Sequence, residues 1–305
     1  MLRYAVRRLA LAVLLALFVS FLSYVLIFAA GDPAIALAGE AGSAADAERM
    51  RAAYGLDQPI WVQYGRWAWA ILHGNFGKSL YFDQPVASIL LGRFGVTMML
   101  GLSSIIFALT LSLPLGIVAA RWQGSAIDHL VRAIAVVGQA MPTFWFALLL
   151  VILLSVTFPI LPTSGSETWR HFVMPTIVLG YFAMPALMRL TRAGMIQVLQ
   201  ADYIRTARAM GIPGRRILFR YALRNAVIPV VSLAAAQFGY MLAGSVVVET
   251  VFALHGAGLL AWESIRRSDL PTIQALVLCF SMIYVALTLA ADLVNAWLDP
   301  RLRSS

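Results

Sequence analysis

Six apolar runs, each long enough to cross a lipid bilayer as a helix, constrain what this chain can fold into. They lie at about residues 9–30, 96–120, 133–157, 172–188, 226–248 and 272–291. At 1.5 Å per residue, the first run extends roughly 33 Å, which is enough to cross the about 30 Å of hydrocarbon in a bilayer. A backbone in lipid must satisfy its hydrogen bonds within itself, and a helix does so. The runs therefore predict an all-α integral membrane protein with six transmembrane helices.

The composition agrees with a membrane location. Hydrophobic residues form 61% of the chain and charged residues 12%, against about a quarter charged residues in soluble proteins. The net charge of +9 comes from basic residues in short segments beside the apolar runs, so membrane topology explains it better than nucleic-acid binding does. Cys279 is the only cysteine, so a disulfide within the chain and a multi-cysteine metal site are excluded. It lies within an apolar run.

The charges of the loops predict the orientation of the helices. The segments at residues 121–132, 189–225 and 298–303 are basic, which places them in the cytoplasm by the positive-inside rule. The segments at 31–93 and 249–271 lack this excess and are expected outside. Together the loops predict a multi-pass protein of the bacterial inner membrane with both termini in the cytoplasm.

Arg3, Arg7 and Arg8 precede the first apolar run. That run is longer than the about 7–15 residues of a signal-peptide core, so we expect an uncleaved helix. The polar segment that follows is the longest in the chain, and we expect two short helices in it, at about residues 44–54 and 59–72. The second is rich in Trp and Tyr, which is typical of an aromatic belt at a membrane interface.

Residues 188–229 form a polar, arginine-rich stretch within this apolar chain. Eight arginines between Arg189 and Arg224 stand against one acid, Asp202. Charged side chains are costly in hydrocarbon, so the stretch is expected outside the bilayer. Arg216, Arg220 and Arg224 form a stripe at helical spacing, which favours a solvated face that touches lipid phosphates.

Local signals predict two short helices in this stretch. Asp202 is placed to cap a helix that runs to Met210, and Gly211 to close it in the left-handed conformation. Pro213 is placed in the first turn of a second helix that reaches about Asn225.

One face of the first predicted helix combines Tyr203, Ala207 and Met210, which are spaced at i, i+4 and i+7. The small side chains of Ala207 and Ala209 allow another surface to approach closely. A helix of this kind is suited to docking into the groove of a partner.

The segments YIRTARAMG and ALRNAVIP resemble the cytoplasmic loop of permease subunits of ATP-binding-cassette (ABC) importers, in the peptide and nickel branch. In that family the loop forms a coupling helix that inserts into the ATPase subunit. The resemblance implies an ATPase-coupling role for Asp202, Tyr203, Ile204, Arg205, Thr206, Ala207, Arg208, Ala209, Met210 and Gly211.

Two departures from the broad family signature narrow the resemblance to the peptide branch. The signature has Glu-Ala-Ala before a glycine, and this chain has Arg205, Thr206 and Ala207 there, with Gly211 in register. The distance from Gly211 to Pro229 is also longer than in the broad signature.

Two further blocks carry the same resemblance. The motifs GDPA, YGLDQP, VQYGRW, GNFGKS and QPV follow one another in the outer segment, and VVVETVFALHGAGLLAWESIRRSDLP begins at Val246. The resemblance implies an N-terminal part at residues 1–94, which holds one transmembrane helix and the extracytoplasmic segment. It also implies an ABC transporter type-1 transmembrane domain at 95–298, with the coupling loop at 189–225.

Two polar residues near the outer ends of the spans stand out. Glu249 could line the translocation path or gate its outer end, and a capping role or exposure to water is an equal alternative. His255 stands where relatives commonly have proline, and without a nearby carboxylate–histidine cluster we expect it to be a loop residue rather than a metal ligand.

The sequence contains no P-loop, no zinc signature and no hydrolase nucleophile motif, so we expect no catalytic site, metal or cofactor in this chain. The six runs as bounded hold no Asp, Glu, Lys, Arg or His, which disfavours a secondary carrier or channel. The resemblance implies a second similar permease subunit, two ATPase subunits that bind ATP and Mg, and an extracytoplasmic solute-binding protein. It implies import of dipeptides or oligopeptides, with nickel chelate, glutathione or another small solute as alternatives.

The predicted topology can be tested with single cysteines introduced at Ser43 and Ser304. An impermeant maleimide added to intact cells should label the first position and not the second, because only the first is expected outside. Equal labelling at both positions would contradict the arrangement of six helices with cytoplasmic ends.

Overall fold

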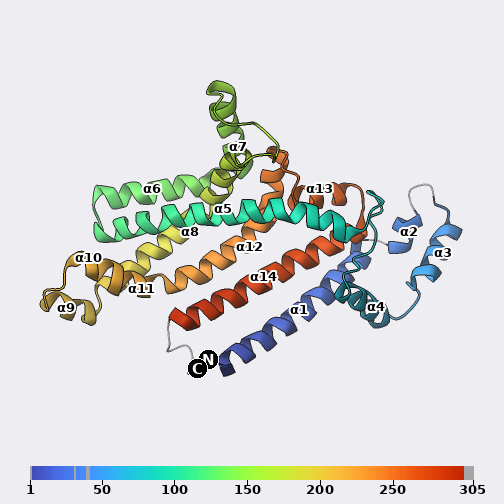
Figure 1. Cartoon of the computed structure of the whole chain (residues 1–305), viewed down its shortest axis with the longest axis horizontal. Coiled ribbons are helices and arrows are strands. Elements are labelled where there is room, and N and C mark those ends of the chain that lie inside the picture. The colour runs from blue at the N-terminus through green and yellow to red at the C-terminus, as the bar shows by residue number, and fades with distance from the viewer. Residues whose placement is uncertain (1, 31, 39–41, 299–305) are drawn as a thin grey trace.

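Long helices run side by side along most of the molecule (Figure 1). The computed structural model describes residues 2–30, 32–38 and 42–298, and every regular element within them is helical. Within these residues, five helices are long and apolar enough to span a membrane: α1 (Leu2–Ala30), α5 (Val86–Arg121), α8 (Trp169–Leu199), α12 (Ile228–Val251) and α14 (Leu270–Leu298). These five confirm five of the predicted spans.

The sixth predicted span, at residues 133–157, is not one straight helix. It is divided into α6 (Ala126–Ala140) and α7 (Thr143–Val151), which are bent by 100° relative to each other. Pro142 lacks a backbone N–H and forces Met141 into extended backbone, with φ of −83° and ψ of 126°. A π-helical turn, η1 (Ile152–Thr157), continues α7. The bent pair completes six spans if it counts as one.

The remaining described helices are short. They are α2 (Pro33–Ala38), α3 (Ala44–Tyr54), α4 (Ile60–Leu72), α9 (Asp202–Ala209), α10 (Gly214–Arg216), η2 (Ile217–Ala222), α11 (Leu223–Ala226) and α13 (Ala257–Arg266). The positions of α3 and α4 confirm the two helices predicted in the outer segment. Ser43 starts α3, because its hydroxyl accepts the Asp46 N–H while its own N–H donates to the Asp46 carboxylate. Hydrogen bonds from the Ser43 side chain and backbone hold the pKa of Asp46 below its usual value.

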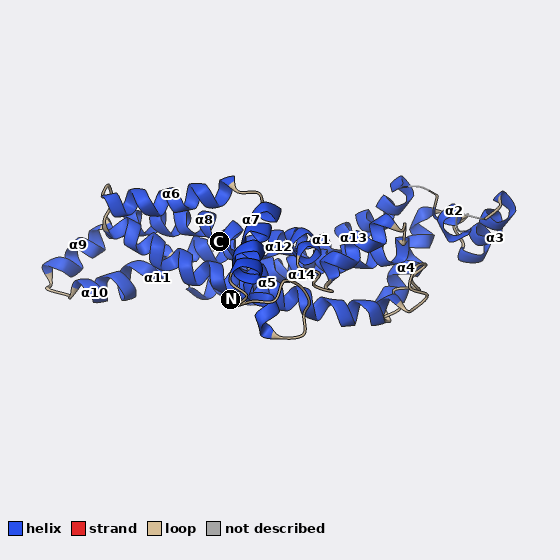
Figure 2. Cartoon of the chain, turned by 90° about the horizontal axis from the view of Figure 1, so that it is seen from above, coloured by secondary structure: helices blue, strands red, loops and turns tan. Residues whose placement is uncertain are grey.

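The short helices gather at opposite ends of the long ones. Figures 1 and 2 show α2, α3 and α4 at one end and α9 and α10 at the other. Asp269, which is fully buried, fixes part of the outer segment to the start of α14. Its carboxylate accepts hydrogen bonds from the Ser79 hydroxyl, the Leu80 N–H (3.0 Å) and the Thr272 hydroxyl (2.7 Å).

The observed helices extend beyond the predicted apolar runs. The fourth span continues to Leu199, which confirms that it enters the arginine-rich loop as a helix. The extension also places ionisable residues inside helices: Glu249 lies in α12, and Asp292 in α14 forms an ion pair of 2.8 Å with Arg8 of α1. The absence of Asp, Glu, Lys, Arg and His therefore holds for the apolar runs as bounded and does not extend to the full helices.

Close packing of α5 against α8 forms the centre of the bundle. A Cβ placed on Gly116 of α5 would lie 2.7 Å from Cβ of Thr191 and 2.8 Å from the Met188 carbonyl oxygen. A Cβ on Gly180 of α8 would lie 2.7 Å from the Ser104 carbonyl oxygen. The absence of side chains at these positions allows the two helix backbones to approach closely, as small residues do in membrane proteins.

Gly116→Ala should destabilise this packing, because the added methyl group would collide with α8 backbone. Overpacking typically costs about 1–3 kcal/mol, so we expect a lower unfolding temperature in detergent. Gly95→Ala is the matched control in the same helix, because a Cβ there meets no atom within 4 Å. An equal loss for both variants, or none for Gly116→Ala, would contradict the close contact of α5 and α8.

Candidate functional site

The arginine-rich loop folds as two short helical segments at one tip of the molecule (Figure 1). α8 ends at Leu199, α9 follows, and α10, η2 and α11 return as one nearly continuous helical segment to α12. Gly211 has a φ of +73°, which confirms the left-handed end predicted for the first helix. The Ile212 N–H donates to the Ala207 carbonyl oxygen at 3.1 Å and closes the last turn.

Two predicted details of these helices are wrong. Asp202 is the first residue of α9 rather than its cap, and Ala201 occupies the cap position without a side-chain hydrogen bond. The carboxylate of Asp202 still lies at the positive end of the helix dipole, where a negative charge is favourable. Pro213 precedes α10 instead of lying in its first turn, because its ψ of 137° is not helical.

The predicted docking face of α9 is also wrong. Ala207 is 4% exposed, whereas Tyr203 and Met210 are 43% and 73% exposed, so the three residues do not share an outward face. Ile204 and Ala207 point inward and pack with a buried cluster of the same chain: Ile117, Ala120, Met195, Ile217, Ala222 and Ala226. Ile204 and Ala207, the buried residues of α9, therefore fix this helix to the rest of the same chain.

The outward face of α9 consists of other residues. The exposed side chains that share it at helical spacing are Asp202, Arg205, Thr206, Ala209 and Met210. Arg208 and Tyr203 lie on its two flanks.

A hydrogen bond across the loop supports this arrangement. The side-chain amide of Asn225 in α11 donates to the Tyr203 hydroxyl at 2.8 Å. Together with the buried cluster, this bond presents the outward face of α9 on a defined base.

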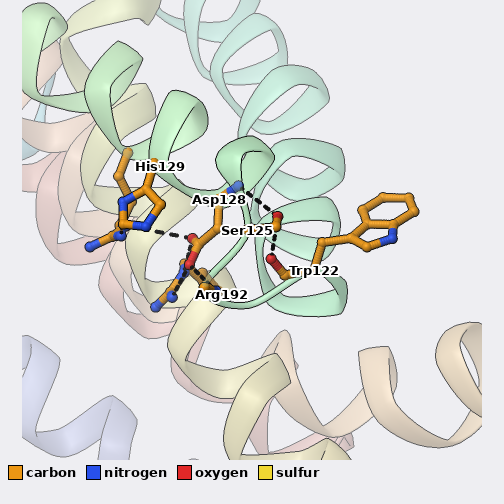
Figure 3. Close-up of polar contacts among 7 residues, drawn as sticks. Trp122, Ser125, Asp128, His129 and Arg192 are labelled. Carbon is orange, nitrogen blue, oxygen red and sulfur yellow. Dashed lines mark hydrogen bonds and ion pairs between the residues drawn. The ribbon is translucent and has the colours of Figure 1, made fainter.

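A buried carboxylate fixes the base of the loop (Figure 3). Asp128 in α6 is 1% exposed and accepts two hydrogen bonds of 2.7 Å from Nε and Nη2 of Arg192 in α8. It also accepts the Gly124 N–H at 3.0 Å. The Ser125 hydroxyl caps α6 by accepting the Asp128 N–H at 3.4 Å and donates to the Trp122 carbonyl oxygen at 2.6 Å. These bonds join the short α5–α6 turn to α8.

Asp128 is not among the site residues that the sequence predicts. A local signal was present, since Ser125 and Asp128 have the S-x-x-D spacing of a helix start. The partner Arg192 lies 64 residues further along the chain, and no sequence spacing indicates that pairing.

Glu249 occupies a closed site at the other side of the bundle. Its carboxylate is fully buried and accepts hydrogen bonds from the Thr97 hydroxyl (2.7 Å) and the Leu259 N–H (2.8 Å). These contacts join α12 to α5 and α13. A Cβ on Gly256 would lie 2.5 Å from the carboxylate, so the glycine makes room for it. The burial gives no support in this structure to a role for Glu249 as a lining residue of an open path.

His255 is exposed in the turn that precedes α13, as expected for a loop residue. Among the described residues, no group of three or more His, Cys, Asp or Glu side chains could hold a metal ion.

Long apolar helices, a broken span and a helical loop at the tip define a polytopic membrane protein. Two family models match the chain: the "Binding-protein-dependent transport system inner membrane component" over residues 112–304 and its N-terminal counterpart over residues 1–101. The chain is 38% identical over 311 residues to the glutathione transport system permease protein GsiC of Salmonella paratyphi A, with 99% of each chain covered. It is 37% identical over 304 residues to GsiC of Escherichia coli K12, again with 99% of each covered.

The fold is similar to that of solved ABC importer structures. Two inward-facing structures of the MetNI methionine ABC transporter match 69% of this chain and 96% of theirs, with TM-scores of 0.58 and 0.56 and identities of 17% and 16%. The chain belongs to the family of binding-protein-dependent transport system inner membrane components. It is a multi-pass inner-membrane permease subunit of an ABC importer of the peptide and nickel branch, with the all-α type I permease fold.

Asp128→Asn should weaken the joint between α6 and α8. The variant loses the carboxylate charge and one acceptor oxygen while Arg192 stays in place, so we expect the free energy of unfolding to fall by about 2–3 kcal/mol. Asp202→Asn is the control, because Asp202 is 96% exposed and lies 3.4 Å from Arg205. We expect its free energy of unfolding to fall by less than about 1 kcal/mol, since exposed ion pairs and helix-dipole contacts are weak. Denaturant unfolding of both variants in detergent tests this, and equal stabilities would show that the buried pair contributes nothing.

Proposed function

We propose that this permease subunit forms half of the translocation path of an ATP-driven importer for small peptides, among which glutathione is the first candidate. The observation that carries the proposal is the match over 99% of the chain, at 37–38% identity, to permeases named for glutathione transport. Glutathione is a tripeptide, so this substrate lies within the peptide class that the resemblance implies. Dipeptides, longer peptides and a nickel chelate are the alternatives that the experiment below separates.

The coupling role belongs to residues 202–211 at the tip of the molecule. We propose that the outward face of α9 docks on an ATPase subunit in the cytoplasm, where both chain termini also lie. A docked helix transmits force only if its base is firm. The burial of Ile204 and Ala207 and the bond between Asp128 and Arg192 supply that base.

The assembled importer would contain this chain, a second similar permease, two ATPase subunits that bind ATP and Mg, and an extracytoplasmic binding protein. ATP binding would close the ATPase pair and draw the two coupling helices together. Closure would rotate the attached helices as rigid bodies and open the path outward, and hydrolysis would reset it.

Two tryptophan substitutions separate docking from folding. Ala209→Trp enlarges the outward face and should weaken ATPase co-purification and uptake without lowering the stability of the chain. Ala207→Trp makes the same change on the buried side, and overpacking there should lower stability by about 1–3 kcal/mol. Uptake, ATPase co-purification and unfolding temperature are compared at matched membrane levels. Wild-type uptake and ATPase recovery for Ala209→Trp would remove the coupling assignment.

Substrate and energy source can be tested by uptake in cells that depend on this chain. Labelled glutathione, a dipeptide, a pentapeptide and a nickel chelate are supplied separately, and we expect glutathione to be taken up. Uptake should persist when the proton gradient is collapsed and ATP is maintained, and should stop with an ATPase subunit that cannot hydrolyse ATP. Preferred uptake of another solute would replace glutathione as the proposed substrate. Uptake driven by a pH gradient without the ATPase would refute the ATP-driven mechanism.

A further inference from the structure

We propose that a basic pocket on the flank of α9 binds the phosphate of an anionic phospholipid headgroup. The pocket has a volume of about 970 Å³ and lies between the α5–α6 turn and the loop from α8 to η2. Its polar lining includes three arginines that come from separate segments, Arg121, Arg208 and Arg215, together with Gln123 and Gln200. We call it the arginine pocket.

The charge of the arginine pocket favours an anion. None of its lining residues is acidic, and none of the three arginines forms an ion pair with another described residue. The carboxylates nearest to these arginines along the chain belong to Asp202 and Asp128. Asp202 lies 3.4 Å from Arg205, and Asp128 is buried and bonded to Arg192. Guanidinium groups match phosphate oxygens in geometry and charge, and three unpaired ones at a single pocket leave a strong attraction for a phosphate.

The position of the arginine pocket favours a lipid as the source of that phosphate. Ala120 and Arg121 line it, and they mark the boundary where the second apolar run gives way to charge. Trp122, which also lines it, is 49% exposed, as is typical of tryptophan at headgroup level. Beyond the turn, Ile127 and Leu130 of α6 are 43% and 62% exposed, which provides an apolar surface for acyl chains. Basic pockets between helices on the cytoplasmic side are suited to anionic headgroups.

The arginine pocket is distinct from the proposed docking face. Of the residues of α9, only Arg208 on its flank lines the pocket, and the five outward residues do not. A lipid bound there would contact the end of α5, the flank of α9 and the start of the returning segment together. It would thus brace the base of the loop without covering the surface offered to the ATPase.

The loop offers a matched pair of variants. The triple variant Arg121→Gln, Arg208→Gln, Arg215→Gln removes three charges from the arginine pocket, and all three side chains are exposed. The control is the triple variant of the exposed stripe outside the pocket: Arg216→Gln, Arg220→Gln, Arg224→Gln. Both remove the same charge from the same loop, so a difference between them reports the pocket rather than general attraction.

The experiment titrates the purified full chain in phosphatidylcholine nanodiscs with phosphatidylglycerol, and native mass spectrometry counts retained lipid. We expect the pocket variant to bind phosphatidylglycerol at least about tenfold more weakly. The control should lose no more than about twofold, because its solvated stripe offers lipid phosphates only a diffuse attraction and no pocket. If the triple variant does not fold, Arg121→Gln and Arg215→Gln are measured singly, each with a loss of several-fold. Inorganic phosphate and glycerol phosphate are titrated in parallel.

Three results would overturn the proposal. Equal losses in both triple variants would mean diffuse attraction to the membrane, and equal affinity for inorganic phosphate and phosphatidylglycerol would mean a free-anion site. Unchanged lipid binding with loss of ATPase co-purification in the pocket variant alone would assign the pocket to an acidic segment of the ATPase. The inference goes beyond the proposed function and shares with it only the cytoplasmic placement of the loop. Since uptake is not the readout, a wrong substrate or coupling assignment would leave its result unchanged.

Discussion

Close contact between α5 and α8 is the constraint on which the rest of the described structure depends. In lipid, apolar side chains gain little by leaving the surrounding hydrocarbon, so helices associate through tight packing and hydrogen bonds. Gly116 and Gly180 permit that packing at two levels, where a Cβ would collide with the facing helix. The α5–α6 turn and the arginine-rich loop both begin where these two helices end. Their positions therefore follow from one contact, and so does the arginine pocket between them.

Hydrogen bonds to three buried carboxylates connect further segments to the packed helices. Asp128, Glu249 and Asp269 are each at most 1% exposed, and each accepts a backbone N–H together with side-chain donors from other segments. An unbonded carboxylate in such a place would be costly, so each group specifies the geometry of its neighbours. Asp128 fixes the turn at the base of the arginine-rich loop, Glu249 fixes the start of α13, and Asp269 fixes the outer segment.

The sequence predicts those features that depend on local chemistry. Apolar length indicates the spans, and Gly211 indicates the left-handed end of α9. Prediction fails where contacts between residues far apart in the sequence determine the position of a side chain or a helix. The spacing of Ala207 in the sequence predicts an outward position, but in the structure the returning helical segment covers its side chain. The bond from Arg192 to Asp128 depends on how α6 and α8 meet, and apolar composition alone does not show that the third span is broken at Pro142.

The break at Pro142 also determines how a displacement of α9 can spread. The buried cluster joins α9 to α8 and to the end of α5, and the bond from Arg192 to Asp128 joins α8 to α6. These connections make α9, α8, α5 and α6 one mechanical unit. The helical hydrogen bonds of α6 end with the bond from the Met141 N–H to the Val137 carbonyl oxygen (3.3 Å), because Pro142 has no N–H. The chain turns by 100° at this point, which is suited to act as a hinge. A pull on α9 would thus move α6 with α8 directly, while α7 follows through the hinge and through its own contacts.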